Sequence, residues 1–435
     1  MTVGLLLVLA AGALPLFCAW LSVPYVFSFP AYGLTAAAAL LAFGFLCLSP
    51  LLSGRYRLME RLGGIGRWYR IHMIIPLVLL LIATTHYIHR LSLYPRSLQT
   101  TGGELAFWLL FAGISSALLF LASPIRGGPI ARLREQVRRK IPMKYSIARL
   151  MHNLLLVCIV LLTLHILQSN LAMPQGDQFP LMRVCILAYG CLGLGLGLWP
   201  KLRRRLSGRL RWSTRQNSGE AVACFSLEAD RPFSFRPGQY GFFRLRGKTA
   251  DGRRLNGEPH PFSFTTLPGQ KTAGICVKAL GDYTRELHQQ QLPAEGSWEG
   301  PFGSFTLPPA GDILMLAGGI GITPFLSWLQ QLRTEGYPGG RAIKLLWALR
   351  HEGENFCTEA LDTAASLNGF SLQLHYSGKD DSKRVGVTEI KTALAGLIHP
   401  GVYLCGPPGF VAVADSYCRQ AGVPVRQIHR EQFSL

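Results

Sequence analysis

Six apolar stretches, each about as long as one crossing of a lipid bilayer, constrain this chain more than any other feature. They span residues 3–22, 31–50, 71–90, 104–123, 147–168 and 181–199. A hydrocarbon core of about 30 Å takes roughly 20 mostly apolar residues to cross as a helix. Only 16% of the 435 residues are charged, which argues against an ordinary soluble, disordered or coiled-coil protein. We therefore expect a membrane-embedded, all-α six-helix bundle over residues 1–205.

The net charge of +20 lies mainly in this apolar half. Residues 1–212 hold 22 Lys and Arg against 4 Asp and Glu, whereas residues 213–435 hold 22 against 20. Nineteen of these cations fall in segments on one side of the spans, and three, Arg90, Arg96 and Arg183, fall on the other. The positive-inside rule then places the N-terminus and everything after residue 200 in the cytoplasm. This pattern indicates a multi-pass protein of the inner (plasma) membrane, with the bilayer and not nucleic acid as its partner.

Four histidines lie in two of the spans, where ionisable residues are costly and usually functional. The third span carries His72 and His86, and the fifth carries His152 and His165. Both spans run from inside to outside, so one histidine of each lies near either surface. Spacings of 14 and 13 residues separate each pair by about 20 Å along its helix. Imidazole is a standard axial ligand of haem iron, so the pattern predicts two stacked haems with one ligand from each helix.

The two spacings differ in how well they keep the histidines on one helix face. Fourteen residues at about 100° each return nearly to the same face, and thirteen fall well short. Either the fifth helix is locally overwound or its two ligands approach at different angles. His89 is a spare histidine near the outer boundary.

The cysteines indicate no shared cross-linking or metal-binding framework, and the glycine-rich sixth span is expected to be structural. The ten cysteines form no CxxC pair, so a disulfide framework or a zinc site is not expected. The run Gly190, Gly193, Gly195 and Gly197 lies inside an apolar span with no strand before it. Close helix packing is therefore its expected use, and not nucleotide binding.

From about residue 213 the pattern changes to short alternating strands separated by turns. Strands are expected at 240–245, 260–264 and 275–278, followed by a short helix at 285–290. Thr284 or Asp282 is a plausible N-cap for that helix, and a helix N-terminus behind a glycine turn suits a pyrophosphate. We expect a small antiparallel β-barrel over residues 206–308.

From residue 312 the pattern is that of an α/β domain, assigned to residues 309–435. An apolar strand at 312–317 leads into Gly318-Gly319-Ile320-Gly321-Ile322-Thr323-Pro324 and then a helix at 325–332. Strand, glycines and helix are the context that a dinucleotide phosphate-binding turn needs. Further strands are expected at 343–349, 371–376 and 401–405.

Two arginines and a cysteine are further candidates. Arg350 ends the strand at 345–349, on the side where ligands bind, and a guanidinium there can hold the 2′-phosphate of NADP. Arg384 is a second candidate for the same contact. Cys405 follows another strand and either lies near the nicotinamide or is buried and inert.

These motifs together resemble the NADPH oxidase and ferric reductase superfamily, in its compact bacterial form. Residues 213–435 look like a ferredoxin–NADP reductase-type dehydrogenase, and residues 1–205 resemble the ferric-reductase-like transmembrane haem domain. The matching dehydrogenase motifs are HPFS at 260–263, KALGDYT at 278–284, GPFG at 300–303, GGIGITP at 318–324, CGPPG at 405–409 and EQF at 431–433.

The resemblance implies a role for each motif. His260, Pro261, Phe262 and Ser263 would hold the flavin, while Lys278, Gly281 and Thr284 would lie at the FAD pyrophosphate. Gly318, Gly319, Gly321, Thr323 and Pro324 would hold NADPH, or NADH, by its pyrophosphate. Gly406 and Pro407, with Cys405, would lie beside the nicotinamide, and Phe433 would stack on the flavin ring.

The resemblance also implies an electron path through a flavocytochrome b. Electrons would pass from cytoplasmic NADPH through FAD to an inner haem on His72 and His152, and then to an outer haem on His86 and His165. Oxygen, giving superoxide, is the expected acceptor, and no obligate protein partner is implied. The alternatives are a ferric or cupric reductase, and a membrane transporter or sensor with a nucleotide-responsive domain and no haem.

The outer acceptor site departs from the animal oxidases, which carry an Arg in the second span and a His four residues after the outer ligand. Here the second span has no Arg, residue 90 is Arg, and the nearby histidine is His89. We therefore expect a generic acceptor site in which Arg90 and Arg96 anchor a helix end at the headgroups. His89 would face lipid or a haem propionate.

Overall fold

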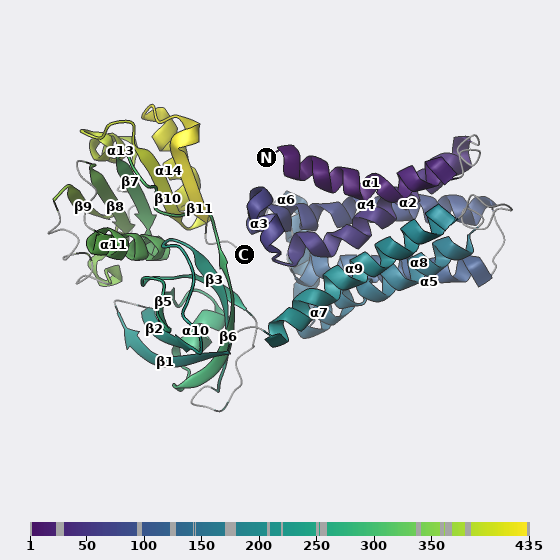
Figure 1. Cartoon of the computed structure of the whole chain (residues 1–435), viewed down its shortest axis with the longest axis horizontal. Coiled ribbons are helices and arrows are strands. Elements are labelled where there is room, and N and C mark those ends of the chain that lie inside the picture. Colours follow the sequence, from purple (N-terminus) through teal and green to yellow (C-terminus); the bar gives the residue numbers. More distant parts are fainter. Residues whose placement is uncertain are drawn as a thin grey trace. The chain divides into compact units, whose positions relative to one another are not determined.

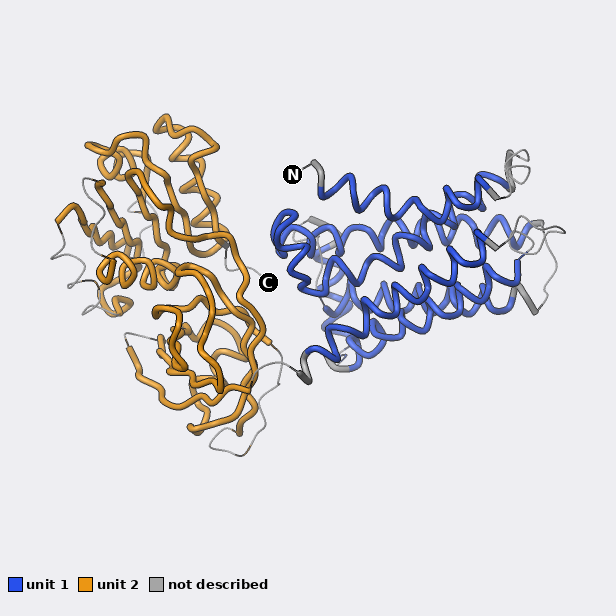
Figure 2. Tube along the Cα trace, in the orientation of Figure 1, with its two compact units in different colours: residues 1–205 blue, residues 206–435 orange. Residues whose placement is uncertain are grey.

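The structure, a computed structural model, forms two compact units, residues 1–205 and 206–435 (Figure 2). It describes residues 2–22, 30–93, 98–121, 128–141, 143, 145–169, 180–206, 209–218, 221–248, 252, 259–335, 341–356, 361, 368–378 and 384–432. Each unit has its own hydrophobic core, and each is described by itself.

The first unit is built of helices, most of them lying lengthwise beside one another (Figure 1). They are α1 (Thr2–Ser22), α2 (Pro30–Ser53), α3 (Arg57–Gly63), α4 (Ile65–Leu93), α5 (Leu98–Phe120), α6 (Gly128–Lys140), α7 (Tyr145–Asn153), α8 (Leu155–Gln168) and α9 (Pro180–Leu206). The expectation of six apolar helices is confirmed. Within the described residues the membrane-length segments are Gly4–Leu21, Gly33–Ser53, Ile65–Ser92, Thr101–Phe120, Ile147–Gln168 and Leu181–Arg203.

The fifth span is not one continuous helix, since α7 ends at Asn153 and α8 begins at Leu155. The backbone N–H of Leu154 is shared between the carbonyls of Leu150 (3.1 Å) and Met151 (3.2 Å). A bond to the third residue back tightens the helix locally. Of the two alternatives left open by the spacing of 13, the structure therefore supports local overwinding.

Glycines allow the sixth span to approach its neighbours closely. A Cβ atom on Gly193 would lie 2.9 Å from the Cα of Cys47 in α2, and one on Gly190 would lie 2.5 Å from Thr163 Oγ1 in α8. The expected packing role is confirmed for these two glycines, whereas Gly195 faces open space.

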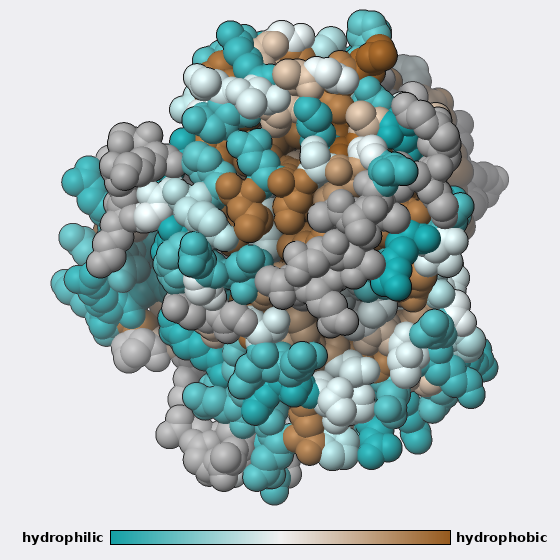
Figure 3. Space-filling view, turned by 90° about the vertical axis from the view of Figure 1, so that its left-hand side faces the viewer, coloured by the Kyte–Doolittle hydropathy of each residue, from teal (hydrophilic) through white to brown (hydrophobic). Residues whose placement is uncertain are grey.

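The two units differ in their outer surfaces. Of 37 exposed large hydrophobic side chains among the described residues, 33 belong to the first unit and 4 to the second. The face of the second unit in Figure 3 is largely hydrophilic, with hydrophobic residues near its centre. Apolar surface on this scale marks contact with another apolar phase or partner.

The second unit begins with a six-stranded antiparallel sheet in the order β4-β3-β6-β1-β2-β5. Its strands are β1 (Arg209–Asn217), β2 (Val222–Ala229), β3 (Tyr240–Arg246), β4 (His260–Ser263), β5 (Thr272–Lys278) and β6 (Ala294–Phe302), with α10 (Asp282–His288) after β5. A single bridge joins Phe264, just beyond one edge strand, to Ile275 of the other. Closure of this sheet into a barrel stays a prediction.

A second, parallel sheet follows in the order β11-β10-β7-β8-β9. Its strands are β7 (Ile313–Gly318), β8 (Ile343–Leu349), β9 (Phe370–Tyr376), β10 (Gly401–Gly406) and β11 (Ile428–Gln432). Helix α11 (Thr323–Glu335) shares a core with one face, and α13 (Val387–Leu394) and α14 (Pro408–Gln420) share a core with the other. The α/β expectation is confirmed, and β11 is a strand that the sequence did not suggest.

One expectation about cysteines was wrong, because Cys224 and Cys276 form a disulfide. The two residues lie directly opposite each other on the antiparallel pair β2 and β5. They are 52 residues apart in the chain, so their proximity depends on strand pairing and not on any local Cys spacing.

Candidate functional site: two histidine cavities and a dinucleotide-binding edge

A cavity in the first unit is lined by His72 of α4 and His152 of α7, together with apolar side chains of several helices. The ring centroids of the two histidines are 6.1 Å apart and their planes are nearly perpendicular. A metal–imidazole bond is about 2.0–2.1 Å long. The distance from each ring centre to its nitrogen, added to one such bond on either side of a metal ion, gives roughly the observed distance between the two ring centroids. We call this the inner cavity.

Ser49 of α2 fixes the orientation of the His72 ring. Its hydroxyl lies 2.9 Å from His72 Nδ1, and its backbone carbonyl accepts from the same nitrogen at 3.1 Å. When Nδ1 is held as a donor, Nε2 is left as the ring nitrogen with a free lone pair. This is the tautomer that an iron ligand requires.

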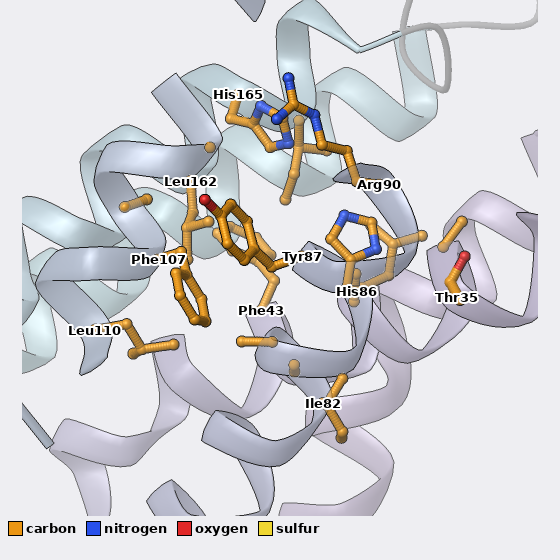
Figure 4. Close-up of a pocket in the computed structure, with 18 of the residues that line it drawn as sticks. Thr35, Phe43, Ile82, His86, Tyr87, Arg90, Phe107, Leu110, Leu162 and His165 are labelled. Atoms are coloured by element: carbon orange, nitrogen blue, oxygen red, sulfur yellow. The ribbon is translucent and has the colours of Figure 1, made fainter. Parts of the chain in front are cut away.

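A second cavity, of about 260 Å³, is lined by His86 of α4 and His165 of α8, and we call it the outer cavity. Figure 4 shows both imidazoles projecting into it, together with Tyr87 and Arg90. The hydroxyl of Tyr87 donates to Glu104 Oε1 at 3.0 Å. The rest of the outer cavity is lined mainly by apolar side chains, among them Phe43, Leu110 and Leu162.

The donor chemistry of both cavities fits axial ligation of a metal by two imidazoles. His86 Nδ1 and His152 Nδ1 are buried and have no hydrogen-bond partner among the described residues. A buried nitrogen left unsatisfied costs free energy unless a ligand or bond partner reaches it. The structure thus brings together the pairs proposed from the sequence, although their role as haem ligands stays a prediction.

Gly103 of α5 is a functional candidate that the sequence did not reveal. A Cβ atom there would lie 2.7 Å from His165 Cε1 and 2.9 Å from its Nε2. Because Gly103 has no side chain, the His165 ring fits against α5 at this position. No motif marks this glycine, because the contact depends on how α5 and α8 pack.

Gly103→Ala is expected to displace the His165 ring and to lower haem content at the outer cavity. The control is Gly102→Ala, since a Cβ on Gly102 meets no atom within 4 Å. Both substitutions gain the same helix propensity, about 1 kcal/mol, so a difference between them reports the contact with His165. Haem per chain, measured by absorption, should fall only for Gly103→Ala, and equal content in both variants would contradict the assignment.

In the second unit, two of the motifs assigned to FAD contact each other. The ring of His260, on β4, stacks on Tyr283 of α10 with centroids 3.7 Å apart. Pro261, Phe262 and Ser263 continue β4, and Ser263 is buried. The structure thus places HPFS beside GDYT, as a shared ligand would require.

The expected N-cap of α10 was wrong. Gly281 is the N-cap, while Asp282 is the first helical residue and Thr284 the third. Thr284 Oγ1 instead accepts from the backbone N–H groups of Leu280 (2.9 Å) and Gly281 (3.0 Å). The hydroxyl therefore binds backbone N–H groups of the turn before the helix, as the N3 side chain of a capping box does.

The glycine-rich turn lies between β7 and α11, where Gly319–Ile322 form a 3₁₀ turn and Thr323 and Pro324 begin α11. Gly319 has φ +53°, and Trp347 Nε1 donates to its carbonyl at 2.8 Å. Because β10, β7 and β8 are adjacent and parallel, Gly406, Gly318 and Leu349 end at one edge of the sheet. Ligands of open parallel sheets bind at this edge.

Lys278 has a partner that the sequence did not suggest. Its Nζ lies 2.6 Å from Glu354 Oε1, and both side chains are largely buried. Burial would raise the pKa of Glu354, but hydrogen bonds from Lys278 and from the backbone N–H of Arg350 outweigh it and lower the pKa. The ion pair therefore links the end of β5 to the turn after β8.

The remaining candidates differ in exposure. Arg350 and Arg384 are exposed, the first directly after β8 and the second shortly before α13. Cys405 is fully buried, and burial raises the pKa of its thiol well above its usual value. Such a cysteine stays a neutral thiol and is a poor nucleophile. Pro407 is the N-cap of α14, and Phe433 lies outside the described residues.

Comparison with known proteins relates the C-terminal half to a large group of reductases. Residues 315–416 match the family described as oxidoreductase NAD-binding domain. A 2-halobenzoate 1,2-dioxygenase electron transfer component from Burkholderia cepacia is 28% identical over 239 residues, covering 53% of this chain and 68% of the relative. A flavohemoprotein from Pseudomonas aeruginosa is 26% identical, covering 52% of this chain and 58% of that protein.

Similar solved structures also cover about half of this chain. The flavohem-like FAD/NAD-binding domain of nitric oxide dioxygenase from Vibrio cholerae is 21% identical with a TM-score of 0.43, covering 52% of this chain and 98% of that one. A cytochrome P450 reductase from Amycolatopsis is 20% identical with a TM-score of 0.45, covering 53% and 70%. The matches span 56–68% of the length of seven curated relatives. Residues 315–416 of this chain therefore match an oxidoreductase NAD-binding domain, and about half of the chain is similar to electron transfer components of dioxygenases and to flavohemoproteins.

Proposed function

We propose that the chain is an inner-membrane oxidoreductase that moves electrons from cytoplasmic NADPH, through FAD and two b-type haems, to an acceptor on the outer side. Oxygen, giving superoxide, is the favoured acceptor, and a ferric or cupric chelate is the second candidate. The observation that carries the proposal is the pairing of one α4 histidine with one histidine of α7 or α8 in each of two cavities.

Each half of the chain supports one part of this path. The NAD-binding family match supports a nicotinamide donor, and the electron transfer and flavohemoprotein relatives support a flavin in the same unit. In the first unit, the exposed apolar side chains and the basic flanking segments support placement across a membrane.

The residues have separate tasks in this scheme. His72 and His152 would hold the inner haem, with Ser49 orienting the first of them, and His86 and His165 would hold the outer one. The apolar cavity walls exclude water from the path. When bound, the flavin converts a two-electron donor into one-electron steps, and the haems carry single electrons.

An absorption spectrum of the purified full-length protein tests the proposal. A Soret band with b-type α and β bands that appear on addition of NADPH is the expected result. A protein that binds nicotinamide but contains no haem would contradict the haem path and favour the alternative, a transporter or sensor with a nucleotide-responsive domain.

NADPH is expected to be preferred over NADH because Arg350 is exposed at the carboxyl end of β8. A charged contact to phosphate is worth about 1.5–3 kcal/mol, roughly 10- to 100-fold in affinity. Arg350→Ala should raise the KM for NADPH by this factor and leave that for NADH unchanged. Arg333→Ala is the control, since this arginine is also exposed but lies in the last turn of α11. If neither KM responds to Arg350→Ala, the residue has no part in cofactor choice.

A further inference from the structure

Arg90 is an arginine of the first unit whose buried charge meets no partner among the described residues. It lies one turn after His86 in α4 and lines the outer cavity. All three of its guanidinium nitrogens are buried and have no hydrogen-bond partner among the described residues. Figure 4 shows its side chain extending into the cavity, which conflicts with the expected role of anchoring a helix end at the headgroups.

The neighbours of Arg90 do not neutralise it. Among the described residues that line the cavity, Glu104 alone carries a carboxylate. It accepts the hydroxyl of Tyr87 at 3.0 Å, and it is not a hydrogen-bond partner of Arg90. His89 also lines the cavity, and Thr35 Oγ1 lies 3.5 Å from its Nδ1. The cavity therefore offers a buried cation with no anion of the described chain to meet it.

We infer that Arg90 binds a carboxylate group of the ligand that occupies the outer cavity. A buried charge without a counter-ion is strongly unfavourable. A guanidinium pairs best with a planar carboxylate, which it can meet with two parallel hydrogen bonds. The inference rests on the proposed function, in which the ligand beside His86 and His165 is a haem, whose propionates are carboxylates. The second possible source is a carboxylate-bearing ferric chelate acting as acceptor.

The first arm of the test compares haem with its dimethyl ester, in which both carboxylates are esterified. Full-length protein produced without haem is titrated with each compound and followed by absorption, as wild type and as Arg90→Met. Wild type should bind haem about 10- to 100-fold more tightly than the ester at the outer site. Arg90→Met should lose that preference, while the inner site, with its ligands unchanged, serves as an internal control.

The second arm identifies an external source. If the carboxylate belongs to the acceptor, haem binding is the same in both proteins, and the KM for ferric citrate rises about 10- to 100-fold in Arg90→Met. Oxygen consumption, which involves no carboxylate, then keeps its KM. Arg90→Lys keeps the charge but loses the paired donors. Its preference for haem over the ester, or its KM for ferric citrate, should therefore lie between the values of wild type and Arg90→Met.

A stability measurement separates this role from a structural one. Because Arg90 has no partner in the described structure, Arg90→Met should leave the melting temperature of the haem-free chain unchanged or raise it. A lowered melting temperature together with an unchanged preference for haem and unchanged kinetics with ferric citrate would overturn the inference. Failure of wild type to bind any haem would instead contradict the proposed function, and direct binding of ferric citrate, compared between wild type and Arg90→Met, would then decide whether Arg90 binds a carboxylate.

Discussion

Replacement of His72 or His152 by alanine is expected to lower the haem content from two per chain to one, and to leave the same haem behind in both cases. The reason is the shared cavity, in which the two rings lie 6.1 Å apart. His86→Ala and His165→Ala should give the complementary product, with the other haem remaining. The absorption spectrum and redox titration of each variant measure both outcomes.

The two alanine variants of each histidine pair are expected to have the same remaining haem. Variants of one pair should share a midpoint potential, and the two pairs should differ, because each haem has its own protein surroundings. His89→Ala is the control and should keep two haems, since this histidine has no partner histidine across the cavity in the proposed assignment. Two haems per chain in any of the four ligand variants would refute the assignment.

The helical half could be predicted well because its determinants are local. Hydropathy and length gave the six apolar helices, and the direction of the spans brought the right histidines together in each cavity. The turn at Leu154 could not be predicted, since neither a glycine nor a proline marks it and the apolar run continues directly after it with Leu155 and Leu156. The open question about the spacing of 13 residues therefore needed the structure.

The features that the sequence missed are all set by packing between distant segments. The room beside His165 depends on Gly103 of another helix, and the orientation of His72 depends on Ser49 of a third. The Cys224–Cys276 disulfide depends on the register of two strands. Motifs succeeded where a local turn determines the shape, as for the glycine-rich turn after β7.

The order of the strands within each sheet could not be predicted from the sequence either. Alternation of polar and apolar residues indicates a strand, but it does not state which strands become neighbours. Strand β11 is five residues long and, among the described strands, pairs with β10 alone. A short edge strand carries too few residues for a clear pattern, which is why it was not expected.

Gly321→Ala is expected to abolish most NADPH oxidation while both haems remain bound. A Cβ atom on this residue would lie 2.2 Å from the backbone oxygen of Cys405 and 2.8 Å from the Cα of Gly406. These are backbone atoms at the end of β10, so no side-chain rotation can relieve the overlap. The turn and the strand must separate, and both belong to the edge where the nicotinamide cofactor is proposed to bind.

The size of the effect follows from the cost of that separation. Overpacking of a well-packed interior typically costs about 1–3 kcal/mol, and a misplaced phosphate-binding turn adds lost contacts to the cofactor, so turnover should fall by about 100-fold or more. The matched control is Gly409→Ala in the neighbouring CGPPG motif, where a Cβ meets no atom within 4 Å. NADPH-driven reduction of a soluble artificial acceptor measures the dehydrogenase half, and dithionite reduction measures the haems separately. Wild-type turnover in Gly321→Ala would show that the turn does not hold the cofactor, whereas loss of both signals in this variant but not in the control would indicate a general folding defect.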